Sequence, residues 1–248
     1  MKAIKDNFSA QAATYAQFRP VFPPELFGFL LEKTTGRAAA WDVGTGNGQV
    51  ANVLAGPFQK VVATDISEAQ LAHAVARENI EYRLERAEKT ASPDQFFDLI
   101  TIGQAIHWFD HAVFFDEIKR VAKPGAVVAA FGYELPDFVL GEINDRLLDF
   151  YAGTLDGFWE PERQIIDDHY ETLPWPFEEI AAPRFSMFNK FQRQDFEGYL
   201  SSWSAVKKFE KARGHSPVAH FMLGLGDIWG EFEAQKAVTP VILRVGRV

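Results

Sequence analysis

The stretch Asp42-Val43-Gly44-Thr45-Gly46-Asn47-Gly48 decides how this chain folds. It follows a short apolar run, residues 38–43, and leads into residues 48–55, where apolar side chains recur at helical spacing. Glycines between a strand and a helix let the backbone turn sharply and let a ligand approach the main chain closely. In an open parallel sheet, ligands bind at the carboxyl ends of the strands, beside such a turn. The stretch therefore predicts a ligand site on a strand–turn–helix unit.

Two carboxylates and one missing glycine indicate which ligand this turn binds. The dinucleotide fingerprint has a third glycine five residues after the first, but that position is Gln49. Asp42 lies two residues before Gly44, where a carboxylate repels a pyrophosphate and suits an ammonium group. Asp65 ends the next apolar run, 21 residues after Gly44, where a carboxylate can accept two hydrogen bonds from a ribose diol. The pattern predicts an adenosine ligand with a cationic, amino-acid-like tail.

Strand and helix patterns alternate from residue 36 to residue 133. Strands are expected at 38–43, 60–65, 80–84, 97–102 and 126–131, the last after a turn at 123–125. Ser67 and Gln70 match a capping box, which predicts a helix that buries apolar side chains at 71, 74 and 75. Asp110 is expected to cap a helix whose residues 114, 118 and 121 share an apolar face. The alternation predicts an α/β fold of three layers, doubly wound, with a mostly parallel sheet of seven strands and right-handed crossovers.

Both flanks of this core have helical patterns. Residues 134–238 are mostly helical, but the segments 184–191 and 241–248 break the pattern. If both segments are strands, they pair at the sheet edge, and the helices before and between them form a helical cap. The expected division is an N-terminal helical arm at 1–34, a ligand-binding core at 35–133, and the cap with the final two strands at 134–248.

The composition excludes several classes of protein. The chain has 248 residues, of which 47% are hydrophobic, enough to bury a sizeable core. Its net charge is −9 without a basic cluster, so no nucleic-acid partner is expected. Cys is absent, which excludes disulfides and a Cys nucleophile. Residues 1–6 contain no apolar stretch of the kind found in a signal peptide. No window of the sequence is long and apolar enough to suggest a membrane span, and no two His have metal-ligand spacing. A cytoplasmic protein without metal or membrane contact is therefore expected.

Taken together, these motifs resemble the class I S-adenosylmethionine-dependent methyltransferases. The resemblance covers residues 8–133, with 42–48 matching the first motif of the family and 61–67 matching the acid that ends its second strand. Arg86-Ala87-Glu88 stands where the family has a small residue and an acid beside the adenine. Residues 97–109 resemble its fourth strand and active-site loop, and 121–126 its turn into the fifth strand. The resemblance implies a Rossmann-like methyltransferase fold, transferase activity, and S-adenosyl-L-methionine as cofactor.

The resemblance also implies which residues contact the cofactor. Residues 8–20 are similar to the arm of a small-molecule subgroup related to trans-aconitate methyltransferase, in which Tyr15 and Arg19 would close over the cofactor. An arginine can pair with the methionine carboxylate, and a tyrosine ring can lie near the sulfonium. The implied cofactor-binding residues are Tyr15, Arg19, Asp42, Gly44, Thr45, Gly46, Asp65, Ile66, Ala87, Glu88, Gln104, Ala105 and His107.

Residues after the fourth strand and in the cap are the candidates for contact with the methyl acceptor. Trp108 follows a buried strand, where binding loops normally begin, while Trp159 and Arg163 lie in the cap. All three are predicted to bind the substrate. His107 is a weaker candidate for a general base, because imidazole exchanges protons near neutral pH but many methyl transfers need no base.

The predicted function is methyl transfer to an oxygen, carboxylate or hydroxyl, of a small-molecule acceptor. A dry aromatic cavity solvates separated charges poorly, so it should slow little a methyl transfer in which an anionic acceptor and a sulfonium neutralise each other. Arg163 or another cap cation would align the anion. Two alternatives are a non-catalytic S-adenosylmethionine-binding protein and an NAD-dependent oxidoreductase, which shares the sheet and the acid at Asp65. A protein acceptor stays open, whereas no base-flipping motif follows the fourth strand. The sequence assigns no oligomeric state.

Overall fold

Five parallel strands form the main part of the sheet in the computed structural model, which describes residues 20–230 and 233–248. They are β1 (Ala39–Val43), β2 (Lys60–Asp65), β3 (Ile80–Leu84), β4 (Phe97–Gly103) and β5 (Ala122–Tyr133). Their spatial order is β3-β2-β1-β4-β5, and each neighbouring pair is parallel. β1 is buried at every position and β4 at all but its last, because helices cover both faces. This burial explains their nearly continuous apolar sequences.

A long antiparallel strand completes the sheet. β9 (Gln235–Arg247) pairs with β5 along one edge, where β6 (Asp137–Phe138) continues β5. The opposite edge of β9 pairs with β7 (Glu178–Glu179) and β8 (Phe185–Phe191). Because β6 extends β5 and β7 precedes β8 on one edge, the sheet is seven strands wide. The predicted seven-stranded, mostly parallel sheet is confirmed, and so is the pairing of the two late segments, although β9 begins at Gln235 rather than at residue 241.

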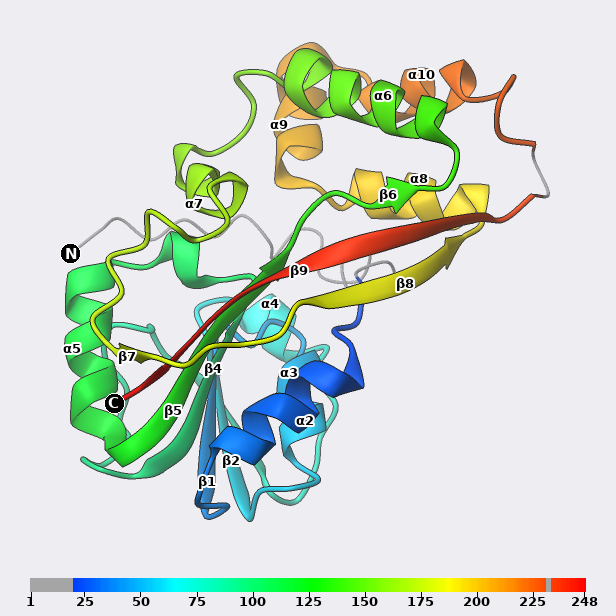
Figure 1. The fold of residues 1–248 in the computed structure, drawn as a ribbon. Coiled ribbons are helices and arrows are strands. Elements are labelled where there is room, and N and C mark those ends of the chain that lie inside the picture. The colour runs from blue at the N-terminus through cyan, green and yellow to red at the C-terminus, as the bar shows by residue number, and fades with distance from the viewer. Residues whose placement is uncertain (1–19, 231–232) are drawn as a thin grey trace.

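Helices cover both faces of the sheet, as the three-layer prediction requires. On one face, α2 (Pro24–Lys33) and α3 (Gln49–Leu54) pack against residues of the central strands through an apolar cluster. On the other face, α5 (His111–Val121) buries Phe114 and Ile118 beside Trp41 of β1. Figure 1 shows α5 and the α2–α3 pair on opposite sides of the strands. α2 lies in the segment predicted as an N-terminal arm, and it forms part of a core layer.

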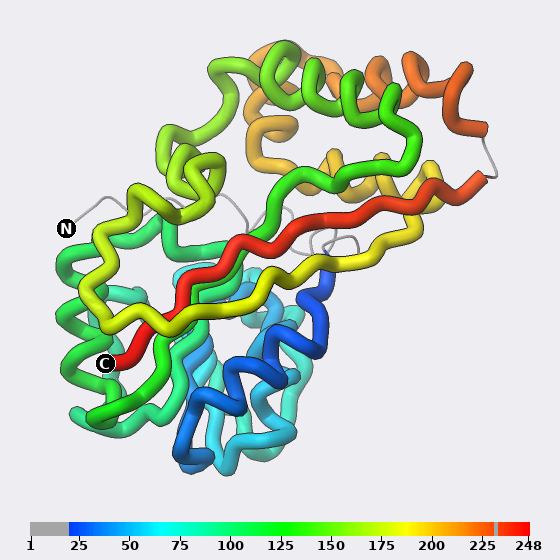
Figure 2. Tube along the Cα trace, viewed as in Figure 1, coloured from blue at the N-terminus to red at the C-terminus, as the bar shows by residue number. Residues whose placement is uncertain are grey.

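Most helices after β5 form a cap at one end of the β8–β9 pair (Figure 1 and Figure 2). They are α6 (Gly141–Asp149), a π-helical turn (Phe150–Thr154), α8 (Arg193–Ser201), α9 (Ser204–Arg213) and α10 (Pro217–Gly224). A 3₁₀ turn (Pro161–Arg163) leads into α7 (Gln164–Asp167), which lies on the side of α5 and buries Ile166 in the same apolar cluster as that helix. Aromatic rings fill the cap: Phe196 stacks on Trp229 at 5.4 Å and meets Phe138 of β6 edge-on at 5.0 Å. The cap is therefore anchored on the part of the sheet that extends beyond the core. The division of the chain into arm, core and cap stays a prediction.

The helix after β2 is shorter than the sequence predicts. α4 (Glu68–Leu71) is a single turn, in which Ser67 Oγ accepts a hydrogen bond from the Gln70 N–H at 3.2 Å, as the capping box predicts. Its buried side chain is Gln70, whereas Val75 is 60% exposed. The expected apolar stripe of Leu71, Ala74 and Val75 is therefore wrong, because one turn cannot present side chains four residues apart to the sheet.

Two further local predictions need correction. The residues Lys123-Pro124-Gly125 lie within β5 rather than before it, at a shift of register against β4. A bulge there accommodates the proline, which has no N–H for the strand ladder. Asp110 does precede α5, but its side chain makes no capping hydrogen bond, and its backbone N–H donates to Glu88 Oε1 at 3.0 Å.

Candidate active site

The three glycines after β1 all have left-handed backbone conformations, but their surroundings differ. Gly44, Gly46 and Gly48 have φ values of 65°, 55° and 81°. A Cβ on Gly44 would lie 2.6 Å from Ala105 Cβ, and one on Gly48 would lie 2.5 Å from Tyr82 Oη. At Gly46 the nearest atom would be 3.8 Å away. Gly44 and Gly48 are thus required by packing, whereas Gly46 faces open space in which a ligand can approach the backbone.

Asp42 lies beneath this loop with its carboxylate buried. Its Oδ2 accepts hydrogen bonds from Thr45 Oγ1 at 2.5 Å and the Ala51 N–H at 3.1 Å, and its Oδ1 accepts one from Thr101 Oγ1 at 3.0 Å. Burial raises the pKa of Asp42 to about 7, and the negative charge of Asp65 adds to the rise. The three hydrogen bonds lower the pKa but do not offset burial. The carboxylate therefore holds the loop together and changes charge near neutral pH.

Asp65 ends β2 and reaches across to the same loop. Its Oδ2 accepts a hydrogen bond from the Gly46 N–H at 2.8 Å, and its Oδ1 accepts one from the Ser67 N–H at 2.9 Å. A carboxylate has about four acceptor positions, so it can accept further hydrogen bonds. The next residue, Ile66, is 40% exposed and can cover a planar ligand group. The two acids that the sequence singled out therefore lie on either side of one glycine loop.

Two cavities open at the carboxyl ends of the strands. The glycine-loop cavity encloses about 460 Å³ together with the solvent at its mouth. Its lining includes Asp42, Gly44, Thr45, Gly46, Gln104 and Tyr133. The tryptophan cavity encloses about 570 Å³ measured in the same way. Its lining includes His107, Trp108, Trp159, Arg163, Gln104 and Tyr133. Gln104 and Tyr133 line both, so the two cavities meet at these residues.

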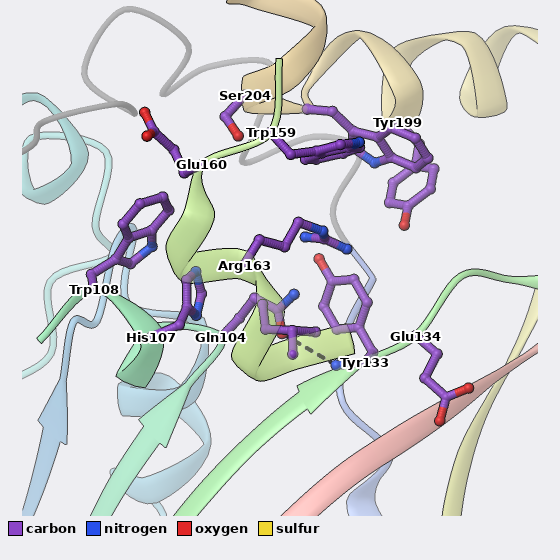
Figure 3. A pocket seen from close by; sticks show the side chains of 12 residues that line it. Gln104, His107, Trp108, Tyr133, Glu134, Trp159, Glu160, Arg163, Tyr199 and Ser204 are labelled. Atoms are coloured by element: carbon purple, nitrogen blue, oxygen red, sulfur yellow. Dashed lines mark hydrogen bonds between the residues drawn. The ribbon is translucent and has the colours of Figure 1, made fainter. Parts of the chain in front are cut away.

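The tryptophan cavity brings together residues from the core and the cap (Figure 3). His107 and Trp108 lie on a 3₁₀ helix (Ile106–Trp108) after β4, with their rings 4.6 Å apart, and His107 is buried. Trp159 comes from the cap and packs against Trp203 at 5.5 Å. The three residues predicted to bind the substrate, Trp108, Trp159 and Arg163, thus line one cavity.

Arg163 is held in place from two sides. Its guanidinium lies 4.6 Å from the centre of the Trp159 ring, and its Nε donates a hydrogen bond to Tyr151 Oη at 2.6 Å. Tyr151 Oη in turn donates to Asp167 Oδ1 at 2.8 Å. Within residues 20–230 and 233–248, neither terminal nitrogen of Arg163 has a hydrogen-bond partner. These nitrogens form a fixed pair of donors in the wall of the cavity, a geometry that suits a carboxylate.

The other described residues predicted to bind the cofactor lie outside the two cavities or behind the glycine loop. Ala87 is buried, and Glu88 accepts hydrogen bonds from the Asp110 N–H at 3.0 Å and from Arg86 Nε at 3.2 Å. Neither residue lines the two cavities. Ala105 supports the glycine loop from behind. Tyr15 and Arg19 lie outside the described residues.

Known proteins similar to this chain agree on one activity. A family profile described as "Methyltransferase domain" matches residues 41–130, from β1 into β5. A protein of Dictyostelium discoideum, provisionally named a methyltransferase, is 34% identical over 84% of this chain and 80% of its own length. A solved structure from Anaeromyxobacter dehalogenans, provisionally named a type II methyltransferase, is 37% identical, covers 93% of this chain and 98% of its own, and has a TM-score of 0.85. An uncharacterized methyltransferase of Mycobacterium tuberculosis is 32% identical over 80% of this chain and 76% of its own length.

The chain belongs to the class I S-adenosylmethionine-dependent methyltransferases. It is therefore an enzyme with S-adenosylmethionine as its cofactor, and both the non-catalytic and the NAD-dependent alternatives are set aside. The described residues fit this cofactor, because Gly46 leaves open space beside the backbone and Asp65 offers acceptors for a ribose. In this methyltransferase, no described helix is long and apolar enough to span a membrane. The described residues also contain no cluster of three or more His, Asp or Glu side chains that could hold a metal.

Several residues of the methyltransferase site were missed by reasoning from the sequence. Tyr133 ends β5 and lines both cavities, and Tyr199 lines the tryptophan cavity from α8. Tyr151 fixes Arg163 from the π-helical turn. The position of Tyr133 at the carboxyl end of a parallel strand was a usable signal, because ligand-contacting residues gather there. Tyr151 and Tyr199 carry no such signal in a helical segment.

Proposed function

We propose that this methyltransferase transfers a methyl group to an oxygen, carboxylate or deprotonated hydroxyl, of a small-molecule acceptor bound in the tryptophan cavity. The observation that carries the proposal is the fixed guanidinium of Arg163: its terminal nitrogens, without a hydrogen-bond partner among the described residues, lie at a cavity that joins the glycine-loop cavity. A planar pair of cationic donors favours an anion with two oxygens. Arg163 would bind such an acceptor through one of its oxygens and leave the other oxygen, at the junction with the glycine-loop cavity, free to react.

The surroundings of Arg163 suit an anionic acceptor. Among the described residues that line the cavity, the acids are Glu134 and Glu160. Glu160 pairs with Lys208 at 2.7 Å, and Glu134 lies 3.6 Å from His169 Nε2. In Figure 3 the Glu134 carboxylate points away from Arg163. Arg163 is the one Lys or Arg among the described residues of the lining, and its side chain is only 20% exposed, which keeps the effect of its positive charge on a ligand strong.

The cofactor would occupy the glycine-loop cavity, where Asp42, Gly44, Thr45 and Gly46 of the lining are proposed as its contacts. Further contacts are proposed outside that lining, at Asp65, Ile66, Ala87, Glu88, Ala105 and His107. Asp65 would bind the ribose, and Asp42 would hold the methionine ammonium directly or through water. Ala87 and Glu88 would lie near the adenine. Outside the described residues, Tyr15 and Arg19 would cover the cofactor, as the resemblance to the small-molecule subgroup implies.

The protein would contribute chiefly position and electrostatics. S-adenosylmethionine supplies an activated methyl group bound to a sulfonium. Holding two reactants in line can lower a barrier by about 7–11 kcal/mol in well-oriented systems. An anionic oxygen needs no base, so His107 would serve as a wall of the acceptor cavity. A neutral hydroxyl acceptor would instead need a proton acceptor, and His107 is the titratable group nearest to that role.

An acceptor screen tests the proposal. S-adenosylhomocysteine formation is followed with a panel of small carboxylic acids and phenols, together with amines and a protein extract. We expect turnover with an acid or phenol, and loss of acceptor affinity by at least about tenfold in Arg163→Leu with cofactor binding unchanged. Arg213→Leu, at an exposed position on α9, is the matched control. Turnover confined to amines or to proteins would overturn the proposal.

A further inference from the structure

Gln104 follows β4 in an unusual backbone conformation. Its φ is 53°, in the left-handed region that residues other than glycine, asparagine and aspartate rarely adopt. The conformation is held by a hydrogen bond from the Gln104 N–H to the Phe131 carbonyl at 2.7 Å. Strained backbone of this kind gathers at functional sites, where the surroundings impose it. Gln104 also lies where the two cavities meet.

The carboxamide of Gln104 has a defined orientation. One of its atoms lies 3.2 Å from the backbone nitrogen of Tyr133, which is a donor, so that atom must be the oxygen Oε1. The dashed line in Figure 3 marks this bond, and the nitrogen Nε2 points the other way, toward the side of Arg163. In the part of the chain that the structure describes, Nε2 has no hydrogen-bond partner. Two N–H groups are thus presented at the junction of the cavities.

The neighbouring strand is shaped to leave room for this carboxamide. A Cβ on Gly132 would lie 2.5 Å from Gln104 Oε1 and 2.6 Å from Tyr170 Oη. Any side chain at residue 132 would therefore displace the amide or the buried tyrosine. Because the ring of Tyr170 is fully buried, the amide cannot relax in that direction. The position of Nε2 is fixed by the core of the protein, as is expected of a group that must orient a ligand.

We infer that Gln104 is an acceptor-positioning residue, whose Nε2 donates a hydrogen bond to an acceptor oxygen at the junction of the two cavities. The inference rests on the proposed function and deepens it. A hydrogen bond to the attacking oxygen would withdraw the electron pair that it needs. The Nε2 donor therefore suits an acceptor that has two oxygens on one carbon. Gln104 binds one of these oxygens, and the other is free to attack the methyl group. The preferred acceptor is a carboxylate, and Gln104 acts on it rather than on the cofactor.

Benzoate is a suitable probe, because it has one carboxylate and a ring for the aromatic walls. Its binding to the protein saturated with S-adenosylhomocysteine is measured by calorimetry for the wild type, Gln104→Leu and Gln104→Glu. The Glu variant keeps an acceptor for the Tyr133 N–H but replaces the donor by a charged oxygen. We expect benzoate affinity to fall about tenfold in Gln104→Leu and further in Gln104→Glu. The S-adenosylhomocysteine affinity should stay within about twofold, which also checks that each variant is folded.

Gln59→Glu is the matched control, because Gln59 is exposed at the opposite end of β2. An NMR readout complements the affinities: the side-chain amide resonances of Gln104 should move when benzoate is added to the wild-type complex. A role in cofactor binding would appear as weakened S-adenosylhomocysteine affinity with unchanged benzoate affinity, and would overturn the inference. Absence of benzoate binding to the wild-type complex at millimolar concentration, or amide resonances that do not move, would also overturn it. The acceptor screen distinguishes the two failures. If acids or phenols are methylated, these outcomes overturn only the inference about Gln104. If only amines or proteins are methylated, the proposed function fails as well.

Discussion

Asp65 Oδ2 accepts a hydrogen bond from the Gly46 N–H at 2.8 Å, so the acid that ends β2 holds the glycine loop that follows β1. The same carboxylate also accepts from the Ser67 N–H at the start of α4. These two contacts fix the side chain in one orientation before any ligand binds. A group that is already ordered loses little entropy on binding, which would strengthen the proposed interaction with a ribose.

The first prediction concerns this carboxylate. Asp65→Ala should weaken S-adenosylhomocysteine binding by about 1.5–3 kcal/mol, because a charged hydrogen-bond partner of the ribose is lost. Asp65→Asn keeps one acceptor oxygen and should lose less. Calorimetric titration measures both affinities, and thermal unfolding checks that the loop change leaves the fold intact. Wild-type affinity in Asp65→Ala would remove the assignment of the ribose to this residue.

The glycines of the loop offer a matched pair of substitutions. Gly46→Ala and Gly48→Ala both place a side chain at a positive φ, which costs roughly 1–2 kcal/mol. Only Gly48→Ala also forces a contact, 2.5 Å from Tyr82 Oη, so it should lower the melting temperature more. Gly46→Ala should instead reduce cofactor affinity, since its methyl group enters the open cavity. Equal effects on stability and binding in the two variants would contradict these distinct roles.

The strands and the glycine loop were the most predictable parts of the molecule. The segments 60–65 and 80–84 coincide with β2 and β3, because strand patterns bounded by turns are set by local sequence. The spacing of Asp42, the glycines and Asp65 is also local, and in the structure both acids form hydrogen bonds with the same loop. The short length of α4 was not predictable, since the capping box marks where a helix starts and says nothing of where it ends.

The tryptophan cavity was only partly predictable. Trp108, Trp159 and Arg163 stood out as residue types that bind ligands, and they line one cavity. The donor geometry of Arg163, however, depends on Tyr151, which lies in a π-helical turn without a recognisable motif. The role of Gln104 depends on the backbone N–H of Tyr133, 29 residues away in the chain. The first contact lies within the cap and the second joins the ends of two core strands, and no periodic pattern in the sequence records either of them.

Tyr151 supplies a prediction about the clamp on Arg163. Tyr151→Phe keeps the ring beside the guanidinium but removes the hydroxyl that joins Arg163 Nε to Asp167. The arginine should then sample other orientations, and the affinity for an acceptor carboxylate should fall about 2- to 10-fold, the effect of one hydrogen bond. Benzoate titration of the S-adenosylhomocysteine complex measures the change. An unchanged benzoate affinity would show that Trp159 and Asp167, whose Oδ1 lies 3.8 Å from Arg163 Nε, are enough to orient Arg163.

The last prediction follows from the buried carboxyl of Asp42. Burial raises its pKa to about 7 in the folded chain, whereas the ordinary value is 3.8. Between these values the folded chain keeps a proton that the unfolded chain has released. The free energy of unfolding should therefore fall as the pH rises from about 4 to 7, by at most about 1.4 kcal/mol per pH unit. In Asp42→Asn this contribution is absent, so the stability advantage of the wild type over the variant should shrink across that window.

Urea unfolding at pH 5, 6, 7 and 8 measures this difference, and Asp98 provides the control. Burial alone would raise the pKa of Asp98, but hydrogen bonds from Lys123 and from the backbone of Ala38 and Ala39 outweigh it and lower the pKa. Asp98 is then ionised in both states above pH 5, so the difference between wild type and Asp98→Asn should be flat there. A flat difference for Asp42→Asn as well would mean that Asp42 is ionised throughout, and that the hydrogen bonds from Thr45, Thr101 and Ala51 fully offset its burial.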